Sequence, residues 1–335
     1  MLKASKYIFL LIILLSMWHC ETDVDLNAEW QDIPVVYGLL NQQDDVHYIR
    51  INRAFLGKGD AIQMASNLDS ITYDPNDLDV KILEYNGDNL IRSIPLDTTM
   101  VHNVDSGVFS YPDQIMYRTQ APSVKLSDDY NYRLEIYNSK LNKYIESETE
   151  LIKDFSLKRP LAGQTFVNYT SQFPSEVVWR TAEDGRLYQL LIRIFYTNYF
   201  TNGTEEQNTL DWKFSQKTAS SLDGGNEMST EIIGQQFYVF LQNAVPEIPG
   251  IERTLDSVSY IVSVANDNYN TYIKVNEPSN TIIQERPEFS NISNGIGLFA
   301  SRYYKSRTLL LNSDSQDSLV NGQYTRDLNF KKPIP

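Results

Sequence analysis

The 335-residue chain has few of the residues that bind metals or form disulfides. It contains one cysteine and three histidines, which excludes a disulfide framework and a cysteine-rich zinc or iron–sulfur site. His47 falls in a predicted strand, where a structural role is expected. The histidines show no metal-ligand spacing, so neither a metal nor a cofactor is predicted.

Basic residues are also scarce. The 29 lysines and arginines are outnumbered by 43 acidic residues, which gives a net charge of −14. Binding to nucleic acid needs a basic surface, so no nucleic-acid partner is expected. Hydrophobic residues make up 41% of the chain, which is enough for a packed core and argues against general disorder.

The N-terminus carries the one long apolar run, IFLLIILL over residues 8–15. It is too short to cross a bilayer of about 30 Å, but it fits the apolar part of a signal peptide. Cys20 follows it and resembles the acylated cysteine of a bacterial lipoprotein, although Trp18 and His19 stand where small residues are usual. We therefore expect a signal peptide over 1–19, a lipid on Cys20 and a polar tether over 20–33. A plain signal peptide or an uncleaved anchor is the alternative.

The remaining chain predicts a mainly β protein. Short segments of alternating apolar and polar residues recur about every 8–12 residues with turn residues between them, which is typical of a β-sandwich. Residues 153–160 indicate a boundary. We predict two immunoglobulin-like or fibronectin type III-like β-sandwich domains, residues 34–153 and 160–330. The expected strands include 35–40, 46–53, 79–85, 89–94, 107–111, 114–118, 131–137, 143–152, 209–215, 254–264, 295–304 and 306–311.

The second domain is expected to contain one or two helices. Residues 229–241 carry an apolar stripe that includes Phe237, with Ser229 or Thr230 as the N-cap. Residues 266–275 predict a shorter helix that ends before a proline. In the preceding strands, the order Pro174, Trp179, Tyr188 resembles the early part of a fibronectin type III-like sandwich.

Motifs for catalysis are largely missing. There is no Gly-x-Ser-x-Gly elbow, and Gly295-Ile-Gly297 precedes a strand, which fits a bulge or tight turn better than a phosphate loop. A glycosidase needs only two carboxylates, so this class stays open, although a non-enzymatic protein is the prediction. The candidate acid pairs, all in turn-like sequence, are Asp44/Asp45, Asp128/Asp129, Glu183/Asp184 and Glu205/Glu206.

Two sets of surface positions are candidates for modification or binding. The aromatic residues Tyr196, Tyr199 and Phe200 precede a polar loop and suit contact with a sugar or a protein, while a place in the core is the alternative. Four Asp-Ser/Thr-apolar tripeptides resemble sites that are O-glycosylated in Bacteroidota secretory proteins. Their acceptor residues are Ser70, Thr98, Ser257 and Ser318.

Three segments, together with Cys20 and the acids after it, carry a family resemblance. These are IPVVYGLL from Ile33, YIRINRAFLG from Tyr48 and NISNGIGLF from Asn291. They resemble Bacteroidota outer-membrane surface lipoproteins encoded beside TonB-dependent receptors, a family without assigned catalytic residues. The resemblance implies a lipid-anchored protein facing the cell surface and a binding or accessory role beside an outer-membrane β-barrel, such as a TonB-dependent transporter. A structural subunit of a secretion, gliding or barrel-assembly machine is the alternative, and a small-molecule or glycan ligand is left open.

Overall fold

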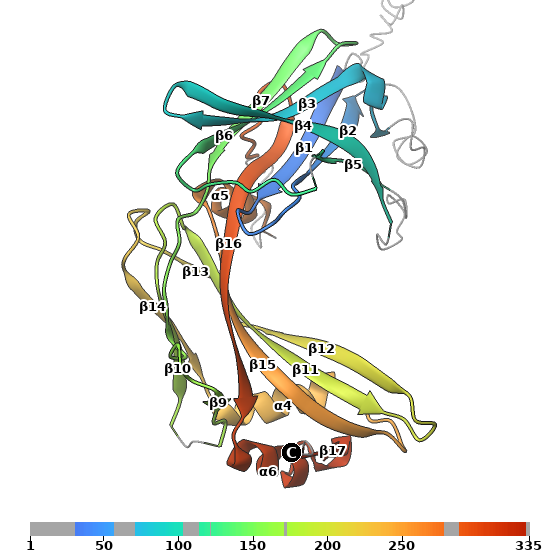
Figure 1. Cartoon of the computed structure of the whole chain (residues 1–335), viewed down its shortest axis with the longest axis vertical. Coiled ribbons are helices and arrows are strands. Elements are labelled where there is room, and N and C mark those ends of the chain that lie inside the picture. The colour runs from blue at the N-terminus through green and yellow to red at the C-terminus, as the bar shows by residue number, and fades with distance from the viewer. Residues whose placement is uncertain are drawn as a thin grey trace, which may run out of the picture.

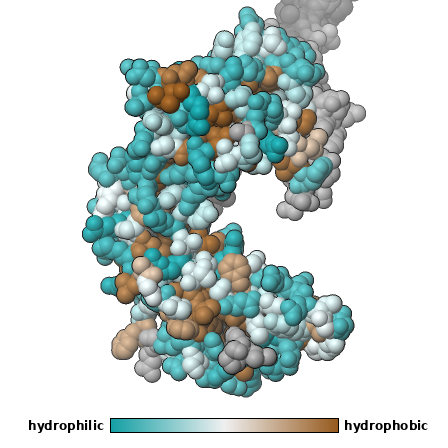
Figure 2. All heavy atoms as spheres, in the orientation of Figure 1, coloured by the Kyte–Doolittle hydropathy of each residue, from teal (hydrophilic) through white to brown (hydrophobic). Residues whose placement is uncertain are grey.

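The computed structural model describes residues 31–56, 71–102, 114–120, 122–170, 173–277 and 288–332. They form a mainly β protein with two units along the long axis of the molecule (Figure 1). The surface is deeply hollowed on one side where the units meet (Figure 2). The predicted signal peptide, Cys20 and the expected strand 107–111 lie outside the described residues. The tether predicted over 20–33 extends too far toward the C-terminus, because the first strand already begins at Gln31.

The first unit is built from antiparallel strands that curl around one core. In the second strand Ile49 and Ile51 are buried, so the alternate side chains Tyr48 and Arg50 face outward. Asn86 pairs with Asn89 in a tight hairpin, and Gly87 in its turn has φ 56°. The strands are β1 (Gln31–Leu40), β2 (Tyr48–Leu56), β3 (Leu78–Asn86), β4 (Asn89–Val101), β5 (Gln114–Thr119), β6 (Asn131–Asn138) and β7 (Lys143–Glu150), with a 3-10 turn η1 (Pro75–Asp77) before β3.

The second unit is a sandwich of two sheets. Trp179 of the smaller sheet stacks on Tyr188 of the larger one, with ring centroids 6.1 Å apart, and both side chains are fully buried. The two aromatic residues thus lie on strands that follow one another in the chain but belong to opposite sheets. The smaller sheet contains β8 (Leu157–Arg159), β10 (Ser175–Arg180) and β14 (Glu227–Ile232). The larger one contains β9 (Phe166–Val167), β11 (Leu187–Tyr199), β12 (Glu205–Lys213), β13 (Lys217–Thr218), β15 (Glu252–Ala265), β16 (Ile296–Leu311) and β17 (Phe330–Lys331).

Strand β16 belongs to both units, and the sequence predicted two strands in its place. Its first half pairs in parallel with β1, from Val35↔Ile296 onward, and its second half pairs antiparallel with β15. Ile292 and Phe299 are buried in the core of the first unit. The structure therefore differs from the predicted division at 153–160. The segment from Ile292 through the first half of β16 was assigned to the second domain, but it completes the first unit.

The α-helices that the structure describes in full come after β14 in the chain. The predicted helix over 266–275 is confirmed as α5 (Asp267–Asn276), and the Asn266 side chain caps it by accepting from the Tyr269 N–H at 3.2 Å. The helix predicted over 229–241 is wrong at its start. Residues 229–232 pair with β10 as part of strand β14, and helix α4 (Gly234–Ala244) begins only after them. Helix α6 (Ser313–Asn321) and the turn η2 (Arg326–Leu328) were not predicted. The predicted fold class, mainly β with sandwich-like units and helices in the second, is confirmed.

Candidate binding groove

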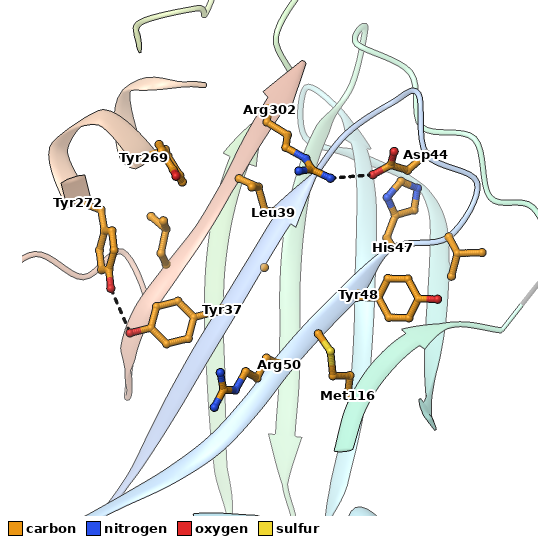
Figure 3. Close-up of a pocket in the computed structure, with 13 residues that line it drawn as sticks. Tyr37, Leu39, Asp44, His47, Tyr48, Arg50, Met116, Tyr269, Tyr272 and Arg302 are labelled. Atoms are coloured by element: carbon orange, nitrogen blue, oxygen red, sulfur yellow. Dashed lines mark hydrogen bonds and ion pairs between the residues drawn. The ribbon is translucent and has the colours of Figure 1, made fainter. Parts of the chain in front are cut away.

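An open groove lies on the outer face of the first unit, between strands β1, β2 and β5 and helix α5 (Figure 3). Its volume of about 590 Å³ falls in the range of small-ligand sites. The lining residues are Tyr37, Gly38, Leu39, Asp44, Val46, His47, Tyr48, Arg50, Met116, Tyr269, Tyr272, Leu298 and Arg302.

Strand alternation creates the floor of the groove. Residues Val36 and Leu40 of β1 are buried, which turns Tyr37 outward, where it is 39% exposed. Its cross-strand neighbour is Arg50 of β2. Gly38 lies between the outward positions, and a Cβ there would come within 2.5 Å of an Ile49 methyl group in the core. Its missing side chain therefore lets the backbone lie flat against the core.

Helix α5 provides one wall of the groove. The Tyr272 hydroxyl lies 3.3 Å from the Tyr37 hydroxyl, and the two rings meet edge to face with centroids 6.1 Å apart. The hydrogen bond to Tyr37, together with partial burial, raises the pKa of Tyr272 to about 12. Because α5 follows β15 of the second unit, this contact fixes part of the second unit against a strand of the first.

The two arginines of the groove differ in whether they form an ion pair. Arg302 lies 3.5 Å from Asp44 in an ion pair. The Arg50 Nε donates to Asn52 Oδ1 at 2.9 Å, but among the described residues its guanidinium has no carboxylate partner. His47 is buried and donates from Nε2 to the Val124 carbonyl at 2.9 Å, and burial lowers its pKa, so the ring is neutral near pH 7. The groove thus carries one positive charge without a carboxylate partner, on a chain whose net charge is −14.

The composition of the groove suits binding more than catalysis. Its one carboxylate, Asp44, is already paired with Arg302, whereas a glycosidase needs two. Across the described residues no group of three or more His, Cys, Asp or Glu side chains is placed to hold a metal. Tyrosine, methionine and arginine are the residue types enriched at protein interfaces, with tyrosine and arginine the more frequent hot spots.

The predicted aromatic residues lie apart from the groove. Tyr196 is only 5% exposed and packs in the core of the second unit, so the expectation that it offers a binding surface is wrong. Alternation along β11 turns it inward. Tyr199 is 37% exposed at the end of that strand, and Phe200 beside it is half-buried.

The candidate acid pairs are dispersed. Asp45 forms an ion pair with Lys125 at 2.8 Å, and Asp129 lies 3.7 Å from Lys153. Burial and the nearby charges of Glu150 and Glu183 raise the pKa of Asp184, which does not line the groove. Glu206 accepts from the Asn198 amide at 3.1 Å.

The candidate O-glycosylation sites differ in exposure. Thr98 is exposed on β4, whereas Ser257 on β15 and Ser318 on α6 are half-buried. Ser70 lies outside the described residues. Among these positions Thr98 is therefore the most accessible to a modifying enzyme.

Most groove residues were not singled out from the sequence. The exceptions are Asp44, named in a candidate acid pair, and His47, expected to be structural. A signal for Tyr48 and Arg50 exists, since both lie on the polar side of a strand whose other side is aliphatic. The Tyr37–Tyr272 contact had no such signal, because it joins residues 235 positions apart.

Comparisons with known proteins add little to this geometry. No family model matches the chain, and no curated protein sequence matches it. Among solved structures, the chain is similar to the C-terminal globular domain of an oligosaccharyltransferase from Pyrococcus abyssi at 11% identity and a TM-score of 0.21. That match covers 79% of this chain and 43% of the other, and at so low a TM-score it carries no argument. None of the described helices is long and apolar enough to span a membrane.

Proposed function

We propose that this protein is a non-enzymatic lipoprotein of the outer-membrane surface, anchored through Cys20. In this proposal it acts as an accessory subunit that binds an outer-membrane β-barrel partner, such as a TonB-dependent transporter. The observation that carries the proposal is the groove, which presents tyrosine, methionine and an arginine that has no carboxylate partner in the described part of the chain. Such a surface concentrates binding energy without offering a catalytic pair.

The position of the groove in the chain supports a partner in the membrane. Strand β1 begins at Gln31, so residues 20–30 would connect the lipid to the unit that carries the groove. Fully extended, this segment would reach about 35–40 Å. Acyl chains that contribute about 0.8 kcal/mol per buried CH₂ would hold the anchor in the bilayer. A groove on this first unit is therefore within reach of the external loops of a neighbouring barrel.

Affinity purification from detergent-solubilised envelopes tests the proposal. The wild-type protein is compared with the double variant Tyr37→Ala/Tyr48→Ala and with Leu90→Ala, which removes a 53% exposed side chain outside the groove. We expect a β-barrel protein to be recovered with the wild type and with Leu90→Ala, at least about tenfold more than with the double variant. A barrel recovered equally with all three would contradict the role of the groove.

The same purification separates the alternatives. Recovery of several subunits of a secretion, gliding or barrel-assembly apparatus would favour the structural role, and Cys20→Ser would then show whether lipidation is needed for assembly. Turnover of a glycan by the purified protein would overturn the non-enzymatic proposal.

A further inference from the structure

We infer that the groove recognises an aromatic side chain that lies next to a single carboxylate on a polypeptide segment. This inference rests on the proposed function, because it names the chemistry by which a partner would be bound at the same groove. It follows from three features of the groove: its apolar walls, its open shape, and a guanidinium that has no carboxylate partner among the described residues.

The walls suit an aromatic side chain. Tyr37 and Tyr48 are about 40% exposed, and Met116 of β5 lies beside Tyr48 (Figure 3). Tyrosine rings pair with another ring in edge-to-face or offset geometry, and a methionine sulfur contacts ring edges favourably. A phenylalanine or tyrosine side chain that entered here would bury most of its surface, and the tyrosine hydroxyls would stay at the rim.

The guanidinium of Arg50 suits one carboxylate. Asn52 Oδ1 accepts from Nε, so the terminal NH₂ groups stay available for the two parallel hydrogen bonds that a carboxylate accepts. The other cation of the groove, Arg302, is paired with Asp44, and His47 is neutral. A polyanion would meet one compensating charge here and would be repelled by a chain of net charge −14. The charges therefore select a ligand with a single negative group.

The spacing of the two features matches one dipeptide unit. Tyr37 and Arg50 are directly opposite each other on β1 and β2, where cross-strand Cβ atoms lie about 4.5–5.5 Å apart. A ring and a carboxylate on the same or adjacent residues can contact both at once. The groove is open to solvent rather than enclosed, which leaves room for the rest of a chain outside it. A peptide segment meets these requirements better than a free metabolite.

Binding of model compounds to the detergent-solubilised full-length protein tests the inference. The probes are N-acetylphenylalanine, its amide, and N-acetyl-aspartyl-phenylalaninamide, followed by ligand-observed NMR or calorimetry. They separate a chain-terminal carboxylate from one on an acidic side chain. We expect at least one of the two acids to bind about tenfold more tightly than the neutral amide, since hydrogen bonds between a guanidinium and a carboxylate are stronger than those between neutral groups.

Variants assign the effect to the groove. Arg50→Gln should remove the preference for the acid while leaving thermal unfolding unchanged, and Arg50→Lys should keep part of it. Arg326→Gln is the control, because Arg326 is exposed in η2 of the second unit and does not line the groove. Equal binding of acids and amide, or a preference that survives Arg50→Gln, would overturn the inference. If a barrel is still recovered in a groove-dependent way while the probes fail, the ligand chemistry is wrong and the accessory function stands.

Discussion

Among single residues, Gly297 is under the strongest backbone constraint. It lies in the half of β16 that pairs in parallel with β1, opposite Val36. Its φ is +127°, a region that L side chains rarely adopt, and an added Cβ would collide with the Val36 carbonyl oxygen. The close approach of the two strands therefore requires glycine here.

Replacement of Gly297 by alanine should therefore destabilise the protein. We expect Gly297→Ala to lower the free energy of unfolding by about 2–4 kcal/mol, since it combines an unfavourable φ with a steric clash. Urea unfolding followed by circular dichroism measures the change. Gly163→Ala is the control, because nothing lies within 4 Å of a Cβ at that position, and it should change stability by less than about 0.5 kcal/mol. If Gly297→Ala lowered the free energy of unfolding as little as Gly163→Ala does, the strand pair would tolerate a side chain at this position.

Among the elements, the two sheets of the second unit contact each other through Tyr188. Its ring stacks on Trp179, and its hydroxyl accepts from the Ala182 N–H at 2.7 Å. Burial raises the pKa of Tyr188 to about 12, and the bond from Ala182 opposes this rise. The neutral hydroxyl is thus favoured by the folded state more than by the unfolded chain, where tyrosine titrates near about 10.

This shift predicts a defined dependence on alkali. The stability linked to neutral Tyr188 is fully present below about pH 10 and is lost as the pH rises through 12. We expect Tyr188→Phe to lose less unfolding free energy than the wild type between pH 10 and 12, because one of the buried hydroxyls that ionise is gone. Denaturant unfolding at pH 8, 10, 11 and 12 measures the difference. Parallel curves for the two proteins would show that Tyr188 does not contribute to the alkaline loss.

The sequence predicted several elements whose determining pattern is local, although it missed α6, which Asn312 caps. Ile49 and Ile51 identify β2, and Asn266 with the residues after it identifies α5. In 229–241 two patterns compete, and the strand wins up to Ile232 because β10 is available as a partner. The groove was out of reach, since it depends on the parallel pairing of β1 with β16. A segment near one end of the chain finds its partner near the other, and no local pattern encodes that choice.

For the whole molecule, the junction between the units determines whether they behave as one body. Besides β16, which passes through both, the fully buried Asn266 joins them. Its backbone N–H donates to the Ser301 carbonyl at 3.1 Å, and its side-chain amide donates to Thr149 Oγ1 of β7 at 2.9 Å. The same side chain caps α5, which carries a wall of the groove. One residue thus connects the second unit, the first unit and the candidate binding surface.

Loss of the Asn266 side chain should have two effects: the two units should uncouple, and the groove should be disturbed. We expect the wild type to show one calorimetric transition, because unfolding of either unit breaks β16. In Asn266→Ala the helix cap and the bond to Thr149 are absent, at a cost of about 1–3 kcal/mol, so the transition should broaden or divide. Asn243→Ala is the control, since its exposed amide bonds only within α4, to the Val239 carbonyl. If both variants melted in one transition at the wild-type temperature, the Asn266 side chain would not be needed to couple the units. If Asn266→Ala also weakened binding at the groove, the position of α5 would be a shared determinant of assembly and recognition.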